Sequence, residues 1–418
     1  MLAEKTGQAA TTLHSCLYRF DELTSGTNTD ALQMHFDLKS TDDLASDLVF
    51  IIDEASMLSH EDARYGAGIT FGSGNVLRDL FDFAQERQII FVGDPCQLPP
   101  VAESAMSAAL DMAFLRKQGF RVSGMNLSRI VRQAADSEIL LTAGDFRRAL
   151  QTNRLQKYPK VRFATSDSLN IVKDHHALLE AYLKTVRESG FQEAIMLGYA
   201  NWQIAMLNRN IRRALYPSAD LQPEELLMVV QNNYPAGLAN GDQIILRSVQ
   251  FHARRAGFTF LKAKVQALYQ EEEKELLLIR ELLYNDQAGL GRKDTQRLLI
   301  DFDQRQRKKG VKRKSEAYRI AMEKDPYLNA LRAKFGYAIT CHKAQGGEWS
   351  QVFLNIHRSL YGLPGPQLYR WYYTALTRAQ EQLWLNDGWW VADFNQRRPQ
   401  AAAAMQRAAQ RRKVNGSR

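Results

Sequence analysis

The sequence predicts an α/β protein built from two parallel-sheet domains, with a helical, charge-rich insertion in the second. Three observations carry this prediction. Apolar runs with strand character alternate with helix-like stretches along much of the chain. Two of these runs end abruptly in polar residues, as strands do at the carboxyl edge of a parallel sheet. Between residues 221 and 331 the pattern changes to one that is rich in charge.

The composition is that of a globular protein and gives a first indication of its partners. With 418 residues and 45% apolar side chains, the chain can fill two or three domain cores. Its formal charge of +9 favours a polyanionic partner. Three widely spaced cysteines predict neither a disulfide framework nor a zinc site, which fits a reducing cytoplasm. No stretch approaches the length of an apolar membrane span, so we expect neither export nor membrane insertion.

The first strand signal ends in two adjacent carboxylates. Residues 47–52 are expected to form a buried strand that delivers Asp53 and Glu54 to a cleft. A second strand is expected at 88–92, after a helix at 76–86. In nucleoside triphosphate hydrolysis one carboxylate holds magnesium while a neighbour orients or deprotonates the attacking water. The pair therefore indicates nucleotide chemistry, although an acidic pair that simply opens a loop is the alternative.

An uncharged amide and two arginines extend this nucleotide pattern. The segment GDPCQLPP at 93–100 contains Gln97, whose amide can bond a phosphate oxygen and sense the γ phosphate, although a plain loop uses the same residues. Arg132 and Arg378 interrupt apolar segments. A buried arginine is costly unless it is paired, and stabilising transition-state phosphate charge is one use for it. A structural salt bridge is an equally good explanation for either residue alone.

Residues 336–349 join an apolar strand to a polar, glycine-containing turn. Such a turn can aim backbone N–H groups, Thr340 and His342 at a phosphodiester backbone, and Glu348 can accept a hydrogen bond from a ribose hydroxyl. Taken singly, His342 is more often a structural histidine. The aromatic residues at 369–373 can stack on bases, but core packing is the commoner explanation at this spacing.

The later part of the chain gives weaker signals. A helix-like stretch from residue 176 leads into a strand at 193–199, and residues 240–242 predict a tight hairpin-type turn. Seven basic residues lie within 305–314, either as a solvated surface or as a nucleic-acid contact. The basic tail at 397–418 is expected to be disordered. Strand patterns return at 335–340, 352–356 and 382–385.

Taken in order, these segments resemble the motifs of superfamily 1 helicases, most closely those of the RecD-like branch. Residues 6–14 resemble the end of the motif Ia region. The other matches are IIDEAS with motif II, GDPCQLPP with motif III, RIVRQ with motif IV, YAITCHKAQGGEW with motif V and YTALTRA with motif VI. The resemblance covers residues 4–387 and implies two RecA-like domains. The domains it implies are a first domain at 1–119 that is incomplete at its N-terminus, a second domain at 120–220 and 332–392, an accessory insertion at 221–331 and a tail at 393–418.

The resemblance also implies roles for individual residues. Asp53 would hold Mg²⁺, Glu54 would be the catalytic base and Gln97 the γ-phosphate sensor. Arg132 and Arg378 would contact the γ phosphate. The remaining implied contacts are Asp94 and Glu348 with the nucleotide, and His14, Thr340, His342, Gln345 and Gly346 with DNA.

The activity implied by this resemblance is an ATP-dependent DNA helicase or translocase. ATP and Mg²⁺ would be its cofactors, single-stranded and duplex DNA its partners, and a nuclease or repair protein a further partner. No G-x-x-x-x-G-K-[ST] pattern occurs in the 418 residues, although such a loop should precede the motif Ia region. We therefore expect impaired activity from a chain that lacks its first segment. A non-catalytic nucleic-acid-binding remnant and a nuclease-linked repair subunit are the alternatives.

Overall fold

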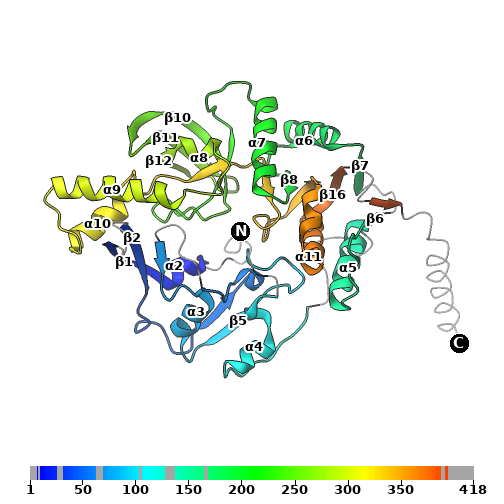
Figure 1. The fold of residues 1–418 in the computed structure, drawn as a ribbon, viewed down its shortest axis with the longest axis horizontal. Coiled ribbons are helices and arrows are strands. Elements are labelled where there is room, and N and C mark those ends of the chain that lie inside the picture. The colour runs from blue at the N-terminus through cyan, green and yellow to red at the C-terminus, as the bar shows by residue number, and fades with distance from the viewer. Residues whose placement is uncertain are drawn as a thin grey trace. The chain divides into compact units, whose positions relative to one another are not determined.

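The computed structural model divides the chain into two compact units, and Figure 1 labels many of their helices and strands. Unit 1 comprises Met1–Asn126 and Ala200–Gly346, and unit 2 comprises Leu127–Tyr199 and Gly347–Arg418. The residues that the structure describes are 7, 10–25, 32–62, 69–101, 103, 106–127, 137–163, 168–386 and 391–393. The domain boundaries expected at residues 119, 220 and 331 stay predictions. The proposed disordered tail lies outside the described residues, apart from Asp393.

Unit 1 contains the two strands that end in polar residues. Strands β3 (Val49–Ile52) and β5 (Gln88–Phe91) pair in parallel, and helix α3 (Val76–Ala84) lies between them in the chain. Leu77, Leu80 and other apolar residues of α3 pack against one face of this small sheet. Both strands and the helix are confirmed, because their apolar periods are long enough to identify them.

The expectation that residues 47–52 form a buried strand is wrong for one face of β3. Ile51 is 65% exposed and Val49 41% exposed, and Ile90 on β5 is 41% exposed. The alternate residues, Phe50 and Ile52, pack into the core with α3. An apolar run without alternation is typical of a strand covered on both faces, but the present chain covers this one on a single face.

A second sheet in unit 1 was not expected from the sequence. Strands β1 (Tyr18–Ser25) and β2 (Leu32–Leu38) are antiparallel, and β4 (Ile69–Phe71) is parallel to β2. The short helix α2 (Leu13–Leu17) precedes β1, and the Thr12 side chain accepts a hydrogen bond from Ser15 N at its start. Gly26, Asn28 and Asp30 lie between β1 and β2, and these turn-forming residue types are a signal from which the hairpin could have been predicted.

A third sheet in unit 1 has five antiparallel strands in the order β12-β11-β10-β9-β13. Gly241, with a φ of +102°, lies at the expected turn in the loop between β9 and β10. A tighter turn at Ala256 and Gly257, both with positive φ, joins β10 to β11. The strands are β9 (Leu226–Val229), β10 (Gln243–Arg255), β11 (Phe258–Ala267), β12 (Glu273–Ile279) and β13 (Ala333–Phe335).

Helices lie between β12 and β13 of this sheet in the chain, so the helical, charge-rich character expected for 221–331 is confirmed for its second half. Phe260 on β11 and Phe302 and Tyr318 on two of the helices form a buried core. The first half is mainly strand. These strands are hard to recognise in the sequence, because charged residues on the outer face of β10 and β11 conceal the alternation of the inward-facing residues. The helices are α8 (Arg280–Tyr284), α9 (Arg292–Lys308) and α10 (Glu316–Lys324).

The basic run at 305–314 includes three arginines that are tied into the structure. Arg305 donates to Asp301 Oδ2 at 2.9 Å and also bonds Asp325. Arg313 donates to both carboxylate oxygens of Asp303 at 2.6 Å. Arg307 also pairs with Asp303, at 2.8 Å. These arginines hold α9 and the adjoining segments together.

Helix α7 (Asn201–Leu215) positions β14 (Ala338–Thr340) within unit 1. The Asn208 side chain donates from Nδ2 to Ala338 O and accepts from Ala338 N, both at 2.9 Å. These two hydrogen bonds satisfy both the backbone N–H and the backbone C=O of Ala338, which is buried. Asn208 therefore fixes the position of β14, and with it the start of the turn that follows this strand.

Unit 2 is built around parallel strands in the order β8-β15-β16-β7. The expected strand at 193–199 and the helix from residue 176 are confirmed as β8 and α6. The elements are α5 (Glu138–Gln151), β6 (Val161–Phe163), β7 (Leu169–Val172), α6 (His175–Ser189), β8 (Ala194–Gly198), β15 (Trp349–Leu354), α11 (Gly365–Leu376), β16 (Ala379–Asn386) and β17 (Val391–Asp393), with β6 and β17 paired in parallel. Shorter helical segments are η1 (Ala55–Met57), η2 (Ala108–Leu110) and α4 (Met112–Lys117) in unit 1 and η3 (Arg358–Gly362) in unit 2.

The aromatic residues at 369–373 belong to the core of unit 2. Trp371 and Tyr372 on α11 are fully buried. Tyr372 stacks on Phe146 of α5 with ring centroids 4.9 Å apart, and Arg147 Nη1 donates to Tyr373 Oη at 2.8 Å. Core packing is therefore confirmed over base stacking. Within the described residues, no helix combines the length and apolarity needed to cross a membrane.

Candidate functional site

The carboxylate pair follows β3 on a constrained turn. Glu54 has a φ of +50°, in the left-handed region that non-glycine residues seldom occupy. Its N–H donates to Asp53 Oδ1 at 2.9 Å, and Ala55 N donates to Val92 O at 2.8 Å. Asp53 is exposed and Glu54 is half-buried. The strained turn thus sets two neighbouring carboxylates in fixed directions at the end of the strand.

The loop at 93–100 follows β5 and lies beside this turn. A Cβ on Gly93 would lie 2.9 Å from Ser56 N, so only glycine permits this close approach. Asp94 Oδ1 accepts a hydrogen bond from Cys96 N at 2.9 Å, which shapes the loop. Gln97 Oε1 is buried and has no hydrogen-bond partner among the described residues. An orphaned buried amide oxygen is uncommon and indicates a site that a water or ligand completes.

The turn after β14 contacts the 93–100 loop and lies close to Glu54, although it is distant from both in the sequence. Gln345 Nε2 donates to Leu98 O at 2.9 Å. Gly346 has a φ of +77°, and a Cβ built on it would lie 3.8 Å from Glu54 Oε1. The structure therefore brings together Glu54, the 93–100 loop and the Gln345–Gly346 turn. Gln345, expected from the resemblance to contact DNA, contacts this loop in the structure, and its contact with DNA stays a prediction.

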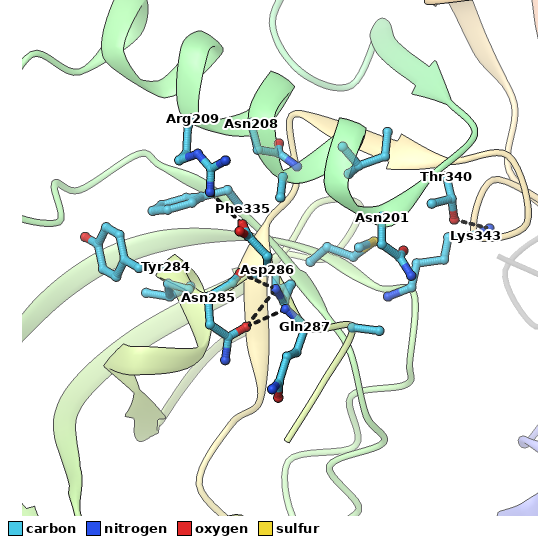
Figure 2. Close-up of a pocket in the computed structure, with 16 residues that line it drawn as sticks. Asn201, Asn208, Arg209, Tyr284, Asn285, Asp286, Gln287, Phe335, Thr340 and Lys343 are labelled. Carbon is cyan, nitrogen blue, oxygen red and sulfur yellow. Dashed lines mark hydrogen bonds and ion pairs between the residues drawn. The ribbon is translucent and has the colours of Figure 1, made fainter. Parts of the chain in front are cut away.

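Thr340 borders a small pocket of about 50 Å³ in unit 1, shown in Figure 2. Asn201 and Asn208 of α7 and the segment after α8 form other parts of its lining. Lys343 and Lys334 also line it, and the sequence analysis had not identified either lysine. Lys334 Nζ donates to Asn285 O at 2.7 Å. Two lysines at one pocket next to Thr340 provide positive charge where a phosphodiester was expected.

Burial shifts the pKa values of the ionisable groups in and beside this pocket. Burial lowers the pKa of Lys334 to about 8, although Asp286 nearby opposes the change. Burial also lowers the pKa of Lys343 to about 8, and the charge of Lys334 adds to the effect. The pKa of His342 is lowered by burial as well, so its ring is neutral at pH 7. His342 can therefore donate or accept one hydrogen bond without adding charge.

A larger groove of about 1010 Å³ lies elsewhere in unit 1 and includes His14. The His14 ring meets Phe71 edge-on, with centroids 5.0 Å apart. Burial lowers the pKa of His14. The lining of this groove comes mainly from the β1-β2-β4 sheet, the loop after β9 and the segment before β13. His14 and Thr340 thus border two different hollows of the same unit.

Unit 2 contains two of the remaining predicted residues. Arg378 is 1% exposed. It donates to Thr374 O and Gly347 O at 3.0 Å and to Thr377 Oγ1 at 3.1 Å. These bonds fix its guanidinium next to the start of β15. Glu348 is half-buried in the same unit, and Arg132 lies outside the described residues.

The residues at the end of β3 fit one part of a magnesium–nucleotide site. Mg²⁺ is commonly held by one or two carboxylates together with substrate phosphates, and Asp53 supplies an exposed carboxylate. No group of three or more His, Cys, Asp or Glu in the described segments is arranged to hold a metal by itself. Gln97 Oε1 and Gln345 Oε1 are both buried acceptors without partners in the described residues. The structure thus offers a metal ligand and two amides, and the sequence offers no glycine-rich loop for the α and β phosphates.

Two family models match separate parts of the chain. The model described as an AAA domain matches residues 1–163. The model described as the UvrD-like helicase C-terminal domain matches residues 335–386. These matches contain the strand-end carboxylates, the 93–100 loop, the turn after β14 and Arg378, and they support a superfamily 1 helicase. No curated protein matches the chain.

Solved structures that resemble the chain include Pif1 helicases. One from Candida albicans has 14% identity and a TM-score of 0.41, and the match covers 81% of this chain and 72% of that one. A Pif1 helicase from Bacteroides in complex with ADP-AlF3 and ssDNA has 16% identity and a TM-score of 0.37, covering 98% and 85%. These values describe a distant likeness.

Proposed function

We propose that the chain is an ATP-dependent DNA helicase of the RecD-like type, which couples ATP hydrolysis to movement along single-stranded DNA and to unwinding. The observation that carries this proposal is the meeting of Glu54, the 93–100 loop and the Gln345–Gly346 turn in unit 1. These three segments are far apart in the sequence, and each resembles a different helicase motif. A shared location is what a common nucleotide site requires.

In this proposal the strand-end residues handle the metal and water. Asp53 would hold Mg²⁺, which supplies charge for the β and γ phosphates when it is bound. Glu54, fixed by its left-handed backbone, would orient the attacking water. Gln97 would be the γ-phosphate sensor by donating from Nε2 to a phosphate oxygen, while its Oε1, without a partner among the described residues, can accept a hydrogen bond from water. Asp94 would act by shaping the loop through Cys96 N. Arg378, Arg132 and Glu348 remain proposed nucleotide contacts.

The block at 337–349 would join the nucleotide to the DNA strand. Gln345 is bonded to the loop that carries Gln97, and Thr340 lies five residues earlier, beside the pocket with Lys343. A displacement of the loop on nucleotide exchange would therefore pull on residues proposed to lie along the strand. The residues that would contact DNA are His14 at the second hollow and Thr340, His342, Gln345 and Gly346 in this block.

We further propose that the chain by itself turns over ATP poorly. Backbone N–H groups of a glycine-rich loop and its lysine normally cradle the phosphates, and the 418 residues contain no G-x-x-x-x-G-K-[ST] pattern. The same observation favours a second candidate function, a nucleic-acid-binding protein without catalysis. A nuclease or repair partner belongs to the RecD-like proposal, and co-purification with a nuclease chain would test it.

A gain-of-activity experiment separates the two candidates. A segment with a strand and a glycine-rich lysine loop would be fused before Met1, and ATPase activity would be measured with and without a poly-dT oligomer. The helicase proposal expects DNA-stimulated turnover in the fusion, lost in Glu54→Gln, and little turnover in the chain alone. DNA binding without turnover in every version would favour the non-catalytic candidate. Strong turnover by the unfused chain would show that another loop holds the phosphates.

A further inference from the structure

The larger groove in unit 1 has two chemically different walls. One wall is aromatic and apolar and comes from the β1-β2-β4 sheet. On it Phe36 and Phe71 are stacked with centroids 4.7 Å apart, and Phe20 meets Phe36 edge-on. The other wall comes from the loop after β9, the end of α10 and the segment before β13, and its polar residues include Gln231, Asn232 and Arg332. One carboxylate, that of Glu323 on α10, also lines the groove. A groove of this kind suits a ligand with both flat apolar groups and anionic groups.

Arg332 is the unusual residue of the polar wall. It is 6% exposed, and its Nη1 donates to Gln231 Oε1. No carboxylate contacts its guanidinium within the part of the chain that the structure describes. Burial lowers its pKa to about 10. Burying a cation away from an opposite charge costs free energy, so such a residue is expected to serve a ligand.

Another buried arginine of the same unit, Arg212, is paired with a carboxylate, as buried arginines usually are. Arg212 donates from Nε and Nη2 to the two carboxylate oxygens of Glu225, at 2.8 and 2.9 Å. Glu225 is fully buried and closes the pair. The fold therefore neutralises one buried guanidinium with a carboxylate and leaves Arg332 with a neutral amide. The difference makes Arg332 the better candidate for binding an anion from outside the chain.

The loop beside Arg332 is held in shape before any ligand binds. Asn240 N donates to Asn232 Oδ1 at 2.7 Å, and Asn233 Nδ2 donates to Asn329 O at 2.8 Å. Val230 N donates to Arg332 O at 2.8 Å. These bonds tie the loop to the segment that contains Arg332. A pre-formed site loses less entropy when it binds.

We propose that Arg332 binds a backbone phosphate of single-stranded nucleic acid in this groove, while a base of the same strand packs against Phe36 and Phe71. A guanidinium presents several N–H donors in a plane that matches phosphate oxygens. Gln231 Oε1 is already engaged by Arg332, so its Nε2 group is available as a second donor. Aromatic side chains stack on bases of any sequence. This inference rests on the proposed function, because it assumes that the chain binds single-stranded DNA.

The test measures binding of a fluorescent dT oligomer by anisotropy over a series of salt concentrations. Arg332→Met removes the charge and keeps much of the volume. Its affinity should fall about tenfold or more, and the slope of log K against log salt should become shallower by about 0.7. Arg254→Met is the matched control, because Arg254 is an exposed arginine on β10 outside the groove. It should leave both quantities close to those of the unaltered chain.

A thermal unfolding measurement on the same variants excludes a purely structural role. Removing an uncompensated buried charge should leave the Tm of Arg332→Met unchanged or raise it. A second variant, Gln231→Met, should weaken binding without changing the salt slope, because it removes a neutral donor.

Each other outcome has one meaning. If Arg332→Met binds with the affinity and slope of the unaltered chain, or if its Tm falls by many degrees, the phosphate-binding role is wrong and the proposed helicase function stands. If the unaltered chain binds no single-stranded DNA at all, the proposed function itself fails.

Discussion

At the scale of single residues, backbone constraints decide where the candidate catalytic groups point. Glu54 is held in the left-handed region, and Gly93 permits a contact with Ser56 N that no other residue allows. Both features are local: each lies just after the end of a strand, at or beside the residues that the motifs single out. Strain of this kind is commonly found at functional sites. Neither feature is visible in the pattern of apolar residues, although the adjacent carboxylates are.

Gly93→Ala should therefore destabilise unit 1. The added Cβ would lie 2.9 Å from a backbone nitrogen that cannot move without breaking the turn at Glu54. We expect a loss of about 1–3 kcal/mol, the usual cost of overpacking. Gly144→Ala is the control, because that glycine lies within α5 and a Cβ there meets nothing within 4 Å. The control should keep or slightly raise the Tm in the same thermal unfolding experiment, and equal losses in both variants would contradict the close-approach argument.

The two lysines at the small pocket predict opposite pH effects on stability and on binding. Burial lowers the pKa of Lys334 and Lys343 from 10.5 to about 8. Between pH 8 and 10.5 the unfolded chain therefore binds more protons than the folded chain, so folding stability should rise with pH in this window. Binding of single-stranded DNA should weaken over the same range, because the pocket loses its positive charge. Asp286 and Arg209 also line this pocket, where they form an ion pair with a separation of 2.6 Å.

Lys343→Met should flatten both pH profiles. Urea unfolding and anisotropy with a dT oligomer, each measured from pH 7 to 10, would check this. The exposed Lys308→Met provides the control. A variant that keeps the full pH dependence of binding would show that Lys343 does not face the strand.

At the scale of elements, strong periodicity was enough to predict β3, β5, α3, α6 and β8, but not the sheets around them. The β10 and β11 strands were missed because bulges near Leu246 and Phe251 shift the alternation along β10. Strands β1 and β2 could have been predicted, because β2 alternates apolar and polar residues and Gly26, Asn28 and Asp30 lie between the two strands. The site could be predicted in part, since Asp53, Glu54 and Gln97 follow strands. The bond from Gln345 to Leu98 joins segments with no pattern in common, so no sequence argument could have paired them.

The arginine network around α9 carries a prediction for this element. Asp303 is buried and accepts hydrogen bonds from Arg313 and from Tyr318 Oη. The Arg313 bond holds the pKa of Asp303 below its usual value. Asp303→Asn should cost about 2–3 kcal/mol, because it leaves buried donors facing a neutral amide. Stability from Asp303 is present at neutral pH and is lost as the pH falls below the ordinary carboxylate pKa, through the lowered folded value.

Glu316→Gln is the control for Asp303→Asn. Glu316 forms exposed pairs with Arg319, which contribute little in water, so no measurable change is expected. Urea unfolding at pH 7 and at about pH 3, below the ordinary carboxylate pKa, would check both variants. The difference between Asp303→Asn and the unaltered chain should shrink at the lower pH. A constant difference would mean that the carboxylate charge is not what stabilises α9.

At the scale of the whole molecule, the open face of the β3–β5 sheet is the main departure from a fully packed domain. Ile51, Val49, Ile90 and Val92 are exposed together on this face and its margin. Contiguous apolar surface and unpaired strand edges promote self-association. Because the other face is packed by α3, the sheet can be altered on the open side without disturbing the core.

Ile51→Lys should therefore reduce self-association without lowering stability. Light scattering over a concentration series would measure the association, and ANS fluorescence would report the accessible apolar surface. Ile52→Lys is the opposite control, because Ile52 packs into the core, and it should unfold unit 1. If Ile51→Lys lowers the Tm as much as Ile52→Lys does, the face is covered in solution.

The bond from Gln345 to Leu98 spans 247 residues of sequence, and unit 1 is assembled from the two stretches on either side of Leu127–Tyr199. During synthesis the early stretch leaves the ribosome long before its partner exists. The corner formed by Glu54, the 93–100 loop and the Gln345–Gly346 turn therefore cannot close until translation has passed residue 346, and loop closure over such a distance is slow compared with local folding. A nascent chain paused before that point would carry Glu54 and Gln97 without the turn that brings them into register.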